Sequence, residues 1–437
     1  GDGVNDTLVG ADVANTWSLT GANAGTVGGV VFSGFSNLAG GSGTDSFTLS
    51  GGTLSGSLNG GLTGVNTLTG DNVATSWTIT GADSGTVTGI AGGFSNIGNL
   101  NGNTNTDSFS LSGGTLSGAI NGGLTGVNTL TGDAVATSWV ITGANAGSVT
   151  GITGGFTNIA NLNGGTNTDS FTLSGGTVSG AINGGLTGVN TLTADNVANT
   201  WTITGANSGT VTGVTGGFSN IANLNGGTGT DSFTLSGGTL TGAINGGLTG
   251  VNTLTGDAVA TSWAITGANA GSVTGVTGGF TNIANLNGGT NTDSFTLSGG
   301  TLSGALNGGL TGVNTLTADN VANSWTITSA NGGSVTGVSG GFTNIANLNG
   351  GTNTDSFTLS GGTLTGAING GLTGVNTLTA DNVANTWVIT GANAGSVTGV
   401  SGGFSNIGNL NGGTNTDSFT LSGGTLTGAI NGGLTGA

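Results

Sequence analysis

The stretch Thr-Trp-Thr-Ile-Thr-Gly-Ala-Asn at residues 200–207 decides the fold, because apolar and polar side chains alternate until a glycine. Alternation with a period of two places the two kinds of side chain on opposite faces of a β-strand. The segment Ser-Phe-Thr-Leu-Ser at residues 232–236 has the same pattern. Both segments are rich in residues that favour strands, and glycine recurs too often for helices. The sequence therefore predicts an all-β protein.

These segments return along the chain at a regular interval. Trp17 begins a series of tryptophans and Asp45 begins a series of aspartates, and both series have a period of about 62 residues, which indicates a tandem repeat. Each repeat begins at Gly-Val-Asn, so we expect one continuous domain over residues 1–437 made of seven repeats. The repeats span residues 3–63, 64–125, 126–187, 188–249, 250–311, 312–373 and 374–435.

A shorter period divides each repeat. One apolar series runs through Ile203, Leu224, Ile244 and Ile265, and a second runs through Val214, Leu235, Leu254 and Val276. Glycine follows two residues after each member, which suits the corners of a coil. We therefore predict a parallel β-helix, or β-solenoid, in which each repeat makes three coils of about 20 residues. With a coil spacing of ~4.8 Å, a repeat would rise ~14 Å. Both a flattened two-sheet cross-section and a three-sided one fit this coil length.

A seven-bladed propeller is the rival architecture for seven repeats. A blade usually takes ~40–50 residues and four strands. It gives no reason for three near-equal coils within each repeat, so the pattern favours the solenoid.

Composition restricts the partners. The 437 residues use eleven residue types, with a formal net charge of −17 and no Lys, Arg or His. A chain without cations cannot neutralise phosphates, so we expect no nucleic-acid partner and no attraction to anionic membranes. No apolar run approaches the ~20 residues of a membrane span, so no membrane insertion is expected. Gly1 stands where a methionine would begin a full chain, and we expect a section of a longer protein.

The sequence predicts no enzyme and no catalytic residue. Two neighbouring carboxylates could hydrolyse a glycoside, but after the first few residues no repeat brings two aspartates close in sequence. No His, Lys, Arg, Glu, Cys or Tyr is present to serve as acid, base or cation. A second aspartate series, which begins at Asp71, fits turns of the backbone. We expect no cofactor, with calcium as the one alternative.

The calcium alternative rests on residues 40–48 and 226–234, which match the nonapeptide Gly-Gly-x-Gly-x-Asp. This match makes Asp45 and Asp231 candidate calcium ligands. Calcium needs six or more oxygen ligands, and the adjacent predicted coils supply no second aspartate. A tight turn made by glycine and aspartate is the favoured interpretation.

Two surfaces could bind other ligands. Pairs such as Thr202/Thr204 and Thr253/Thr255 could align into an ice-binding face, and around the second apolar series two of three coils carry hydroxyl pairs. Solvated strands rich in threonine are the simpler interpretation. The Trp and Phe rings could stack on carbohydrate if they were exposed, but we expect them to fill the core.

Residues 201–207, 216–224 and 226–235 resemble repeats of giant bacterial β-strand-repeat surface proteins, which are similar to filamentous-haemagglutinin-type adhesins. The resemblance covers essentially the whole chain. It implies secretion, a right-handed parallel β-helix, and adhesion or fibre formation through cell-surface or carbohydrate contact. The chain departs from that pattern in its complete lack of basic residues and of a separate binding module.

Together these features predict a structural, non-catalytic extracellular filament. The alternative is a stalk segment of a giant adhesin whose binding tip lies outside this chain, and a lesser alternative is an ice- or calcium-binding solenoid. Open solenoid ends expose unpaired strand edges, so we also expect self-association end to end.

Overall fold

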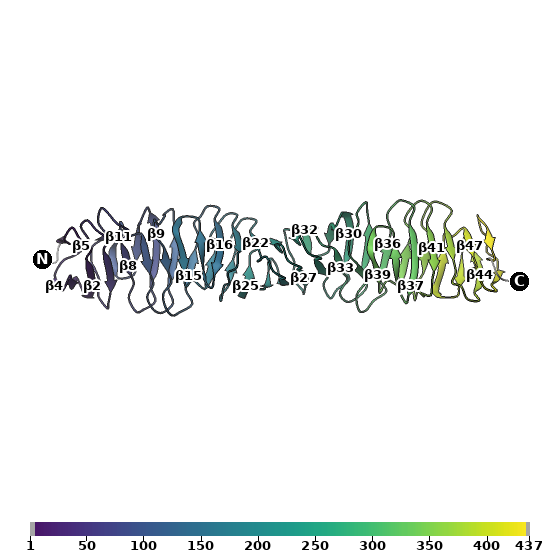
Figure 1. The fold of residues 1–437 in the computed structure, drawn as a ribbon, viewed down its shortest axis with the longest axis horizontal. Helices are drawn as coiled ribbons and strands as arrows, with labels where there is room; N and C mark the ends of the chain where they lie inside the picture. The colour runs from purple at the N-terminus through teal and green to yellow at the C-terminus, as the bar shows by residue number, and fades with distance from the viewer. Residues whose placement is uncertain (1–4, 434–437) are drawn as a thin grey trace. The chain divides into compact units, whose positions relative to one another are not determined.

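The computed structural model describes residues 5–433, and its regular elements are all β-strands (Figure 1). These residues form 49 strands, β1 to β49, which is seven strands in each of seven repeats. Most strands pair in parallel with a strand from a neighbouring coil. This confirms the all-β solenoid, and the parallel pairing excludes a propeller, whose blades are antiparallel. Within residues 5–433 no helix is long and apolar enough to cross a membrane.

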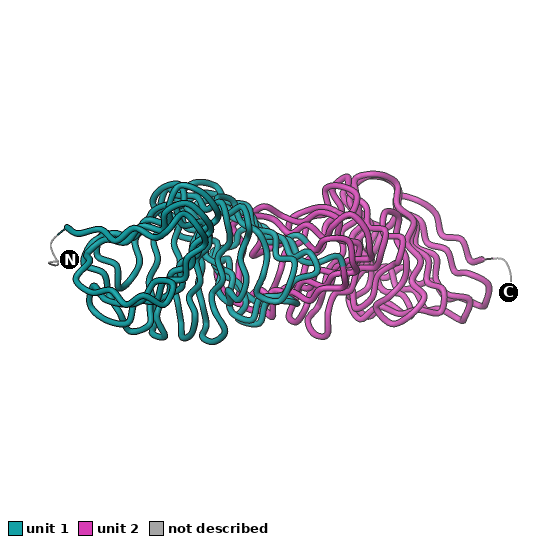
Figure 2. The backbone as a smooth tube through the Cα atoms, turned by 60° about the vertical axis from the view of Figure 1, so that its left-hand side comes forward, with its two compact units in different colours: residues 1–196, 207–225 teal, residues 197–206, 226–437 magenta. Residues whose placement is uncertain are grey.

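The chain divides into two compact units, coloured separately in Figure 2. Unit 1 comprises residues 1–196 and 207–225, and unit 2 comprises residues 197–206 and 226–437. Each unit contains two sheets, named here 1a and 1b in unit 1 and 2a and 2b in unit 2. The expectation of one continuous solenoid stays a prediction.

Sheet 1a contains, in pairing order, β1 (Thr7–Val9), β5 (Asn37–Ala39), β7 (Leu58–Asn59), β11 (Ile90–Ser95), β10 (Ser84–Val87), β9 (Ser76–Gly81), β13 (Ser108–Leu111), β15 (Thr129–Thr131), β19 (Asn161–Asn163), β21 (Ile182–Asn183), β25 (Val214–Ser219) and β24 (Ser208–Val211). Sheet 1b contains β4 (Val30–Ser33), β3 (Ala24–Val27), β2 (Thr16–Gly21), β6 (Ser46–Leu49), β8 (Thr67–Thr69), β12 (Asn99–Asn101), β14 (Ile120–Asn121), β18 (Ile152–Thr157), β17 (Ala146–Val149), β16 (Ser138–Gly143), β20 (Ser170–Leu173), β22 (Thr191–Thr193) and β26 (Asn223–Asn225).

Sheet 2a contains β23 (Thr200–Gly205), β27 (Ser232–Leu235), β29 (Thr253–Thr255), β33 (Asn285–Asn287), β35 (Leu306–Asn307), β39 (Val338–Thr343), β38 (Gly332–Val335), β37 (Ser324–Ser329), β41 (Ser356–Leu359), β43 (Thr377–Thr379), β47 (Asn409–Asn411) and β49 (Ile430–Asn431). Sheet 2b contains β28 (Ile244–Asn245), β32 (Val276–Thr281), β31 (Ala270–Val273), β30 (Ser262–Gly267), β34 (Ser294–Leu297), β36 (Thr315–Thr317), β40 (Asn347–Asn349), β42 (Ile368–Asn369), β46 (Val400–Ser405), β45 (Ala394–Val397), β44 (Thr386–Gly391) and β48 (Ser418–Leu421).

The chain alternates between the two sheets of a unit. In the repeat over residues 250–311, β29 lies in sheet 2a, β30 to β32 lie in 2b, β33 in 2a, β34 in 2b and β35 in 2a. Strands β30, β31 and β32 form an antiparallel meander, so they occupy a single visit to their sheet. A repeat therefore makes five visits, and because five is odd the next repeat begins on the opposite sheet.

This path differs from the three near-equal coils predicted for each repeat. Trp201 pairs with Phe233, Phe233 with Leu254, and Ile244 with Phe280, so the chain length between stacked residues changes from strand to strand. The predicted ladders were correct only in part: the equivalents of Leu224 and Ile244 pair one repeat later, at Leu286 and Leu306, whereas Ile203 pairs with Leu235 of the other series.

The rise of a repeat differs for the same reason. Between Trp201 and Trp325 the register passes through seven steps in sheet 2a for two repeats. One repeat thus rises 3.5 rungs, or ~17 Å, at ~4.8 Å per strand. The extra height over the predicted ~14 Å comes from the meander, which adds strands to the sheet without leaving it.

The meander follows from two turns and one close approach. Asn269 (φ 54°) and Gly275 (φ 92°) sit in the turns, where positive φ favours these residue types. Gly271 lies between Ile265 on one side and Phe280 on the other. A Cβ at Gly271 would overlap the carbonyl oxygen of Ala264, so only glycine allows the three strands to pair this closely.

The core lies between the sheets, as predicted for the aromatic residues. All seven tryptophans are at most 2 % exposed. Trp263 stacks on Phe295 at 5.6 Å between ring centroids and meets the edge of Phe280 at 6.1 Å. Offset-stacked and edge-to-face rings are the favourable aromatic geometries. The ladder continues from Phe295 to Leu316 in the next rung.

Candidate functional site

The regular spacing of the aspartates builds a polar ladder along the loops that join the sheets. At Asp231 the carboxylate Oδ1 accepts hydrogen bonds from the backbone N and side-chain Nδ2 of Asn199, at 2.8 and 2.9 Å. The backbone N of Asp231 donates to Oδ1 of Asn252, and Nδ2 of Asn252 donates to the carbonyl of Asn282. The ladder therefore ties four successive loops together.

The aspartates of this ladder are buried carboxylates without a cation. Asp107, Asp169, Asp231, Asp293 and Asp355 are at most 1 % exposed. Oδ2 of each has no hydrogen-bond partner within the described residues. Burial, only partly opposed by hydrogen bonds from the preceding Thr or Asn, raises the pKa of these five carboxyl groups. The glycine five residues earlier is required, because a Cβ there would overlap Oδ2.

Two versions of the ladder occur. In one, Thr261 Oγ1 donates to Asp293 Oδ1 at 2.5 Å and accepts from Trp263 Nε1 at 2.8 Å. In the other, Asn323 replaces the threonine and donates Nδ2 to Asp355 Oδ1 at 2.9 Å. Trp325 Nε1 then has no hydrogen-bond partner in the described part of the chain, although the ring is buried.

The candidate calcium ligands Asp45 and Asp231 both belong to this ladder. Oδ1 of Asp45 accepts from the backbone N and Nδ2 of Asn15, at 2.7 and 2.8 Å. Oxygen atoms that face N–H donors are poorly placed for a cation, so the geometry favours the turn interpretation. Within residues 5–433, no three acidic, His or Cys side chains gather where they could share a metal ion. Calcium binding stays a hypothesis.

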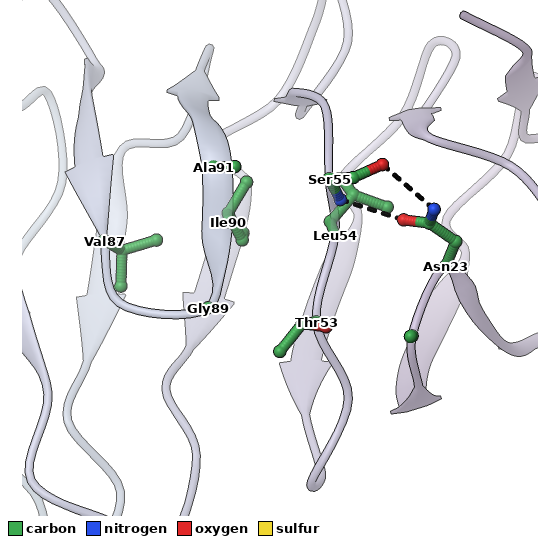
Figure 3. A pocket seen from close by; sticks show the side chains of 9 residues that line it. Asn23, Thr53, Leu54, Ser55, Val87, Gly89, Ile90 and Ala91 are labelled. Carbon is green, nitrogen blue, oxygen red and sulfur yellow. Dashed lines mark hydrogen bonds between the residues drawn. The ribbon is translucent and has the colours of Figure 1, made fainter. Parts of the chain in front are cut away.

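A hollow of unit 1 lies beside strands β10 and β11 of its meander. Its volume is about 410 Å³, and its lining includes Thr53, Leu54, Val87 and Ile90 (Figure 3). At its rim, Asn23 Nδ2 donates to Ser55 Oγ at 2.9 Å, and Ser55 N donates to Asn23 Oδ1 at 2.8 Å. The side chains that line it are aliphatic or neutral polar groups, so the hollow offers no acid–base pair.

A second surface feature is a set of exposed leucines at the tips of the Gly-Gly-Leu-Thr-Gly loops within residues 5–433. Leu124 is 87 % exposed although its backbone N donates to the carbonyl of Asn103 at 2.8 Å. The equivalent residues are Leu62, Leu186, Leu248, Leu310 and Leu372. Sequence reasoning missed these tips, although a lone apolar residue between glycines in a polar loop signals exposure.

The threonine pairs are brought together, but in a different register from the predicted one. Thr200 and Thr202 pair with Ser232 and Thr234, which pair with Thr253 and Thr255. Three consecutive rungs therefore carry hydroxyl pairs, in place of the predicted two of three.

No protein-family model matches the chain, and a search of curated proteins finds no similar sequence. The functional interpretation therefore rests on the fold and on the chemistry of its surfaces.

Proposed function

We propose that this chain is a structural, non-catalytic filament protein of a cell exterior, built from stacked solenoid repeats. The observation that best supports this proposal is that successive repeats make the same contacts with one another. Trp263, Phe295 and Leu316 form consecutive rungs, and the equivalent set one repeat later forms the same ladder. Since every repeat buries the next in the same way, stability grows with repeat number.

Composition supports an exterior location. The chain has no Lys or Arg, so trypsin-like proteases find no cleavage site. The net charge of −17 repels neighbouring copies sideways and keeps them soluble.

Self-association end to end is part of the proposal. Each rung within the described residues pairs its backbone groups with the next rung, so the edge strand of an open stack would accept a further rung of the same kind.

The second candidate is a stalk segment of a giant adhesin, which the sequence resemblance favours. In that case a separate module would contact the cell surface or carbohydrate, and this chain would hold it away from the producing cell.

Cryo-electron microscopy of the native material tests both candidates. Continuous filaments with a ~4.8 Å rung spacing and a ~34 Å axial repeat, seven rungs for two repeats, would support the filament. Discrete rods with the same spacing would support the stalk. Absence of the rung spacing would contradict both.

A further inference from the structure

The outer face of sheet 2a carries a regular array of hydroxyl groups. In β37, β41 and β43 the outward residues are Ser324 and Thr326, Ser356 and Thr358, and Thr377 and Thr379. The register places them in two rows across three neighbouring strands. The residues between them, such as Trp325 and Phe357, point into the core and are buried.

One row of the array is free to bind. The side chains of Thr326, Thr358 and Thr379 are partly exposed, and none is engaged in a hydrogen bond within residues 5–433. In the other row, Ser356 Oγ donates to Ser324 Oγ at 3.4 Å, and Asn409 Nδ2 donates to Thr377 Oγ1 at 3.3 Å. The free row therefore presents hydroxyl and methyl groups on a fixed backbone.

The spacing of the array is set by the sheet. Neighbouring strands lie ~4.8 Å apart, and outward residues on one strand lie ~6.7 Å apart. The oxygen atoms on the prism planes of hexagonal ice repeat at comparable intervals. The array contains no charged group, which would hold liquid water in a different order.

The two sheets of unit 2 differ at the position that follows each tryptophan. This outward residue is threonine in sheet 2a, at Thr202 and Thr326, but Ala264 and Val388 in sheet 2b. The side chains point away from the core, so packing does not require the difference. Because the position after the tryptophan falls on alternate sheets in successive repeats, its threonines in unit 2 lie on sheet 2a alone.

Unit 1 shows the same asymmetry after its first repeat. The residue after tryptophan is Thr78 in sheet 1a and Val140 in sheet 1b, although the first repeat places Ser18 in sheet 1b. The middle strand of the meander adds a second difference. Serine stands there in sheet 1a and alanine in sheet 1b, at Ser84 and Ser208 against Ala24 and Ala146.

We propose that sheets 1a and 2a carry ice-binding faces, with the threonine rows as the contact surface. Their methyl groups exclude liquid water, and their hydroxyl groups join the lattice of an ice prism plane. Glycan binding is disfavoured because all seven tryptophans are buried, which leaves no indole ring for a sugar to stack on. This property is separate from the filament role, so either could hold without the other.

The test is ice recrystallisation inhibition by the full chain at micromolar concentration, with two matched triple variants. The first, Ser110→Tyr, Thr234→Tyr and Thr358→Tyr, places bulk at the centre of arrays on sheets 1a and 2a. The second, Thr48→Tyr, Thr172→Tyr and Thr296→Tyr, places it at equivalent positions on sheets 1b and 2b. We expect the unsubstituted chain to inhibit, the first variant to lose inhibition and the second to retain it.

A third variant, Ser110→Ala, Thr234→Val and Thr358→Val, removes the hydroxyl groups without adding bulk and keeps the test decisive if the tyrosine variant fails to fold. It must also lower the inhibition while its circular dichroism and melting temperature stay unchanged. No inhibition by the unsubstituted chain, or equal loss in the first two variants, would overturn the proposal. Adsorption to chitin or cellulose without any effect on ice would overturn it too, and would identify glycan-binding faces.

Discussion

At the scale of the residue, the residues that stand seven and two positions before each tryptophan vary together. Gly256 accompanies Thr261, and a Cβ on that glycine would lie 2.9 Å from the carbonyl oxygen of Gly288, 3.0 Å from the ring of Trp263 and 3.2 Å from Thr261 Oγ1. Ala318 instead accompanies Asn323. The same pairs are Gly70/Thr75, Gly132/Thr137, Ala194/Asn199 and Ala380/Asn385, and the first repeat combines Gly10 with Asn15. The alanine methyl thus competes with the threonine for space beside the indole.

This competition predicts a coupling between two substitutions. Asn323→Thr should supply a partner for Trp325 Nε1, but Ala318 should oppose it unless Ala318→Gly is also made. We expect the double variant to be more stable than the sum of the single ones by about 1 kcal/mol, within the usual range for touching residues. Urea unfolding of the four proteins gives the cycle. Simple additivity would show that the methyl and the threonine do not meet.

The buried aspartates predict an unusual dependence of stability on pH. Burial raises the pKa of Asp107, Asp169, Asp231, Asp293 and Asp355 above 3.8, their value in the unfolded chain. The folded state therefore binds protons more tightly than the unfolded state, and this contribution is full below pH ~3.8 and is lost as pH rises through the folded pKa. We expect the free energy of unfolding to increase as pH falls from neutrality towards that value.

The variant Asp293→Asn provides the control for this prediction. Its amide cannot titrate, so the rise in stability on acidification should be smaller by the share of one aspartate. Urea unfolding from pH 7 to pH 4 measures both proteins. A stability that falls with acidification in the unsubstituted chain would mean that the buried carboxylates are held ionised.

At the scale of the element, the meander depends on glycine for steric reasons. Gly333 lies between Ile327 and Phe342, and a Cβ there would overlap the carbonyl oxygen of Thr326. We expect Gly333→Ala to cost about 3 kcal/mol or more, because backbone atoms cannot move aside. Gly361→Ala is the matched control: its φ is 80° and no atom lies within 4 Å, so only backbone strain of about 1 kcal/mol applies. Equal melting temperatures for the two variants would contradict the steric account.

The meander is also where sequence reasoning reached its limit. Strand identity followed from alternation in segments such as residues 232–235, and burial of Trp201 and Phe233 followed from their size. The path of the chain was not predicted correctly from the sequence, because the even spacing of the glycines suggested coils at the place where the chain turns back on itself. The sequence does contain a turn signal at Thr150-Gly151, which connects β17 and β18 in two residues. The longer period of the glycines indicated coils instead and outweighed this signal.

The aspartate ladder and the hydroxyl rows were likewise only partly predictable from the sequence. Asp231 was recognised as a turn residue from its glycines, and the structure adds the neighbours Asn199 and Asn252. Both neighbours are distant in the sequence, and only the register of the coils brings them to the aspartate. The hydroxyl rows depend on the register in the same way, since a different pairing would have placed Thr234 beside Gly213.

At the scale of the whole molecule, the odd number of visits per repeat gives the chain a double period. The sequence pattern recurs in every repeat, whereas a given position returns to the same sheet only in every second repeat, as from Trp201 to Trp325. Substitutions at one position of alternate repeats therefore change one face and leave the other unchanged. With an even number of visits, a given position would lie on the same face in every repeat, so variation between alternate repeats could not separate the faces.

Deletion of residues 250–311 tests this logic. Thr234→Cys and Thr358→Cys introduce the only cysteines of the chain, so spin labels attach there alone. In the full chain both positions lie in sheet 2a, seven rungs or ~34 Å apart. In the deletion variant the second label takes the place of Thr296 in sheet 2b, 3.5 rungs along and one sheet separation across, a distance of ~20 Å.

The full chain with labels at Thr234→Cys and Thr296→Cys is the matched control, and pulsed electron paramagnetic resonance should give it the same distance as the deletion variant. A distance of ~14 Å in both proteins would place both labels on one face and restore three coils per repeat. Agreement of the two proteins at ~20 Å would establish that a single repeat carries the chain from one face to the other. It would also mean that loss of one repeat divides the Thr202 and Thr326 rows between opposite sheets, so such a loss should weaken binding to ice more than it weakens the fold.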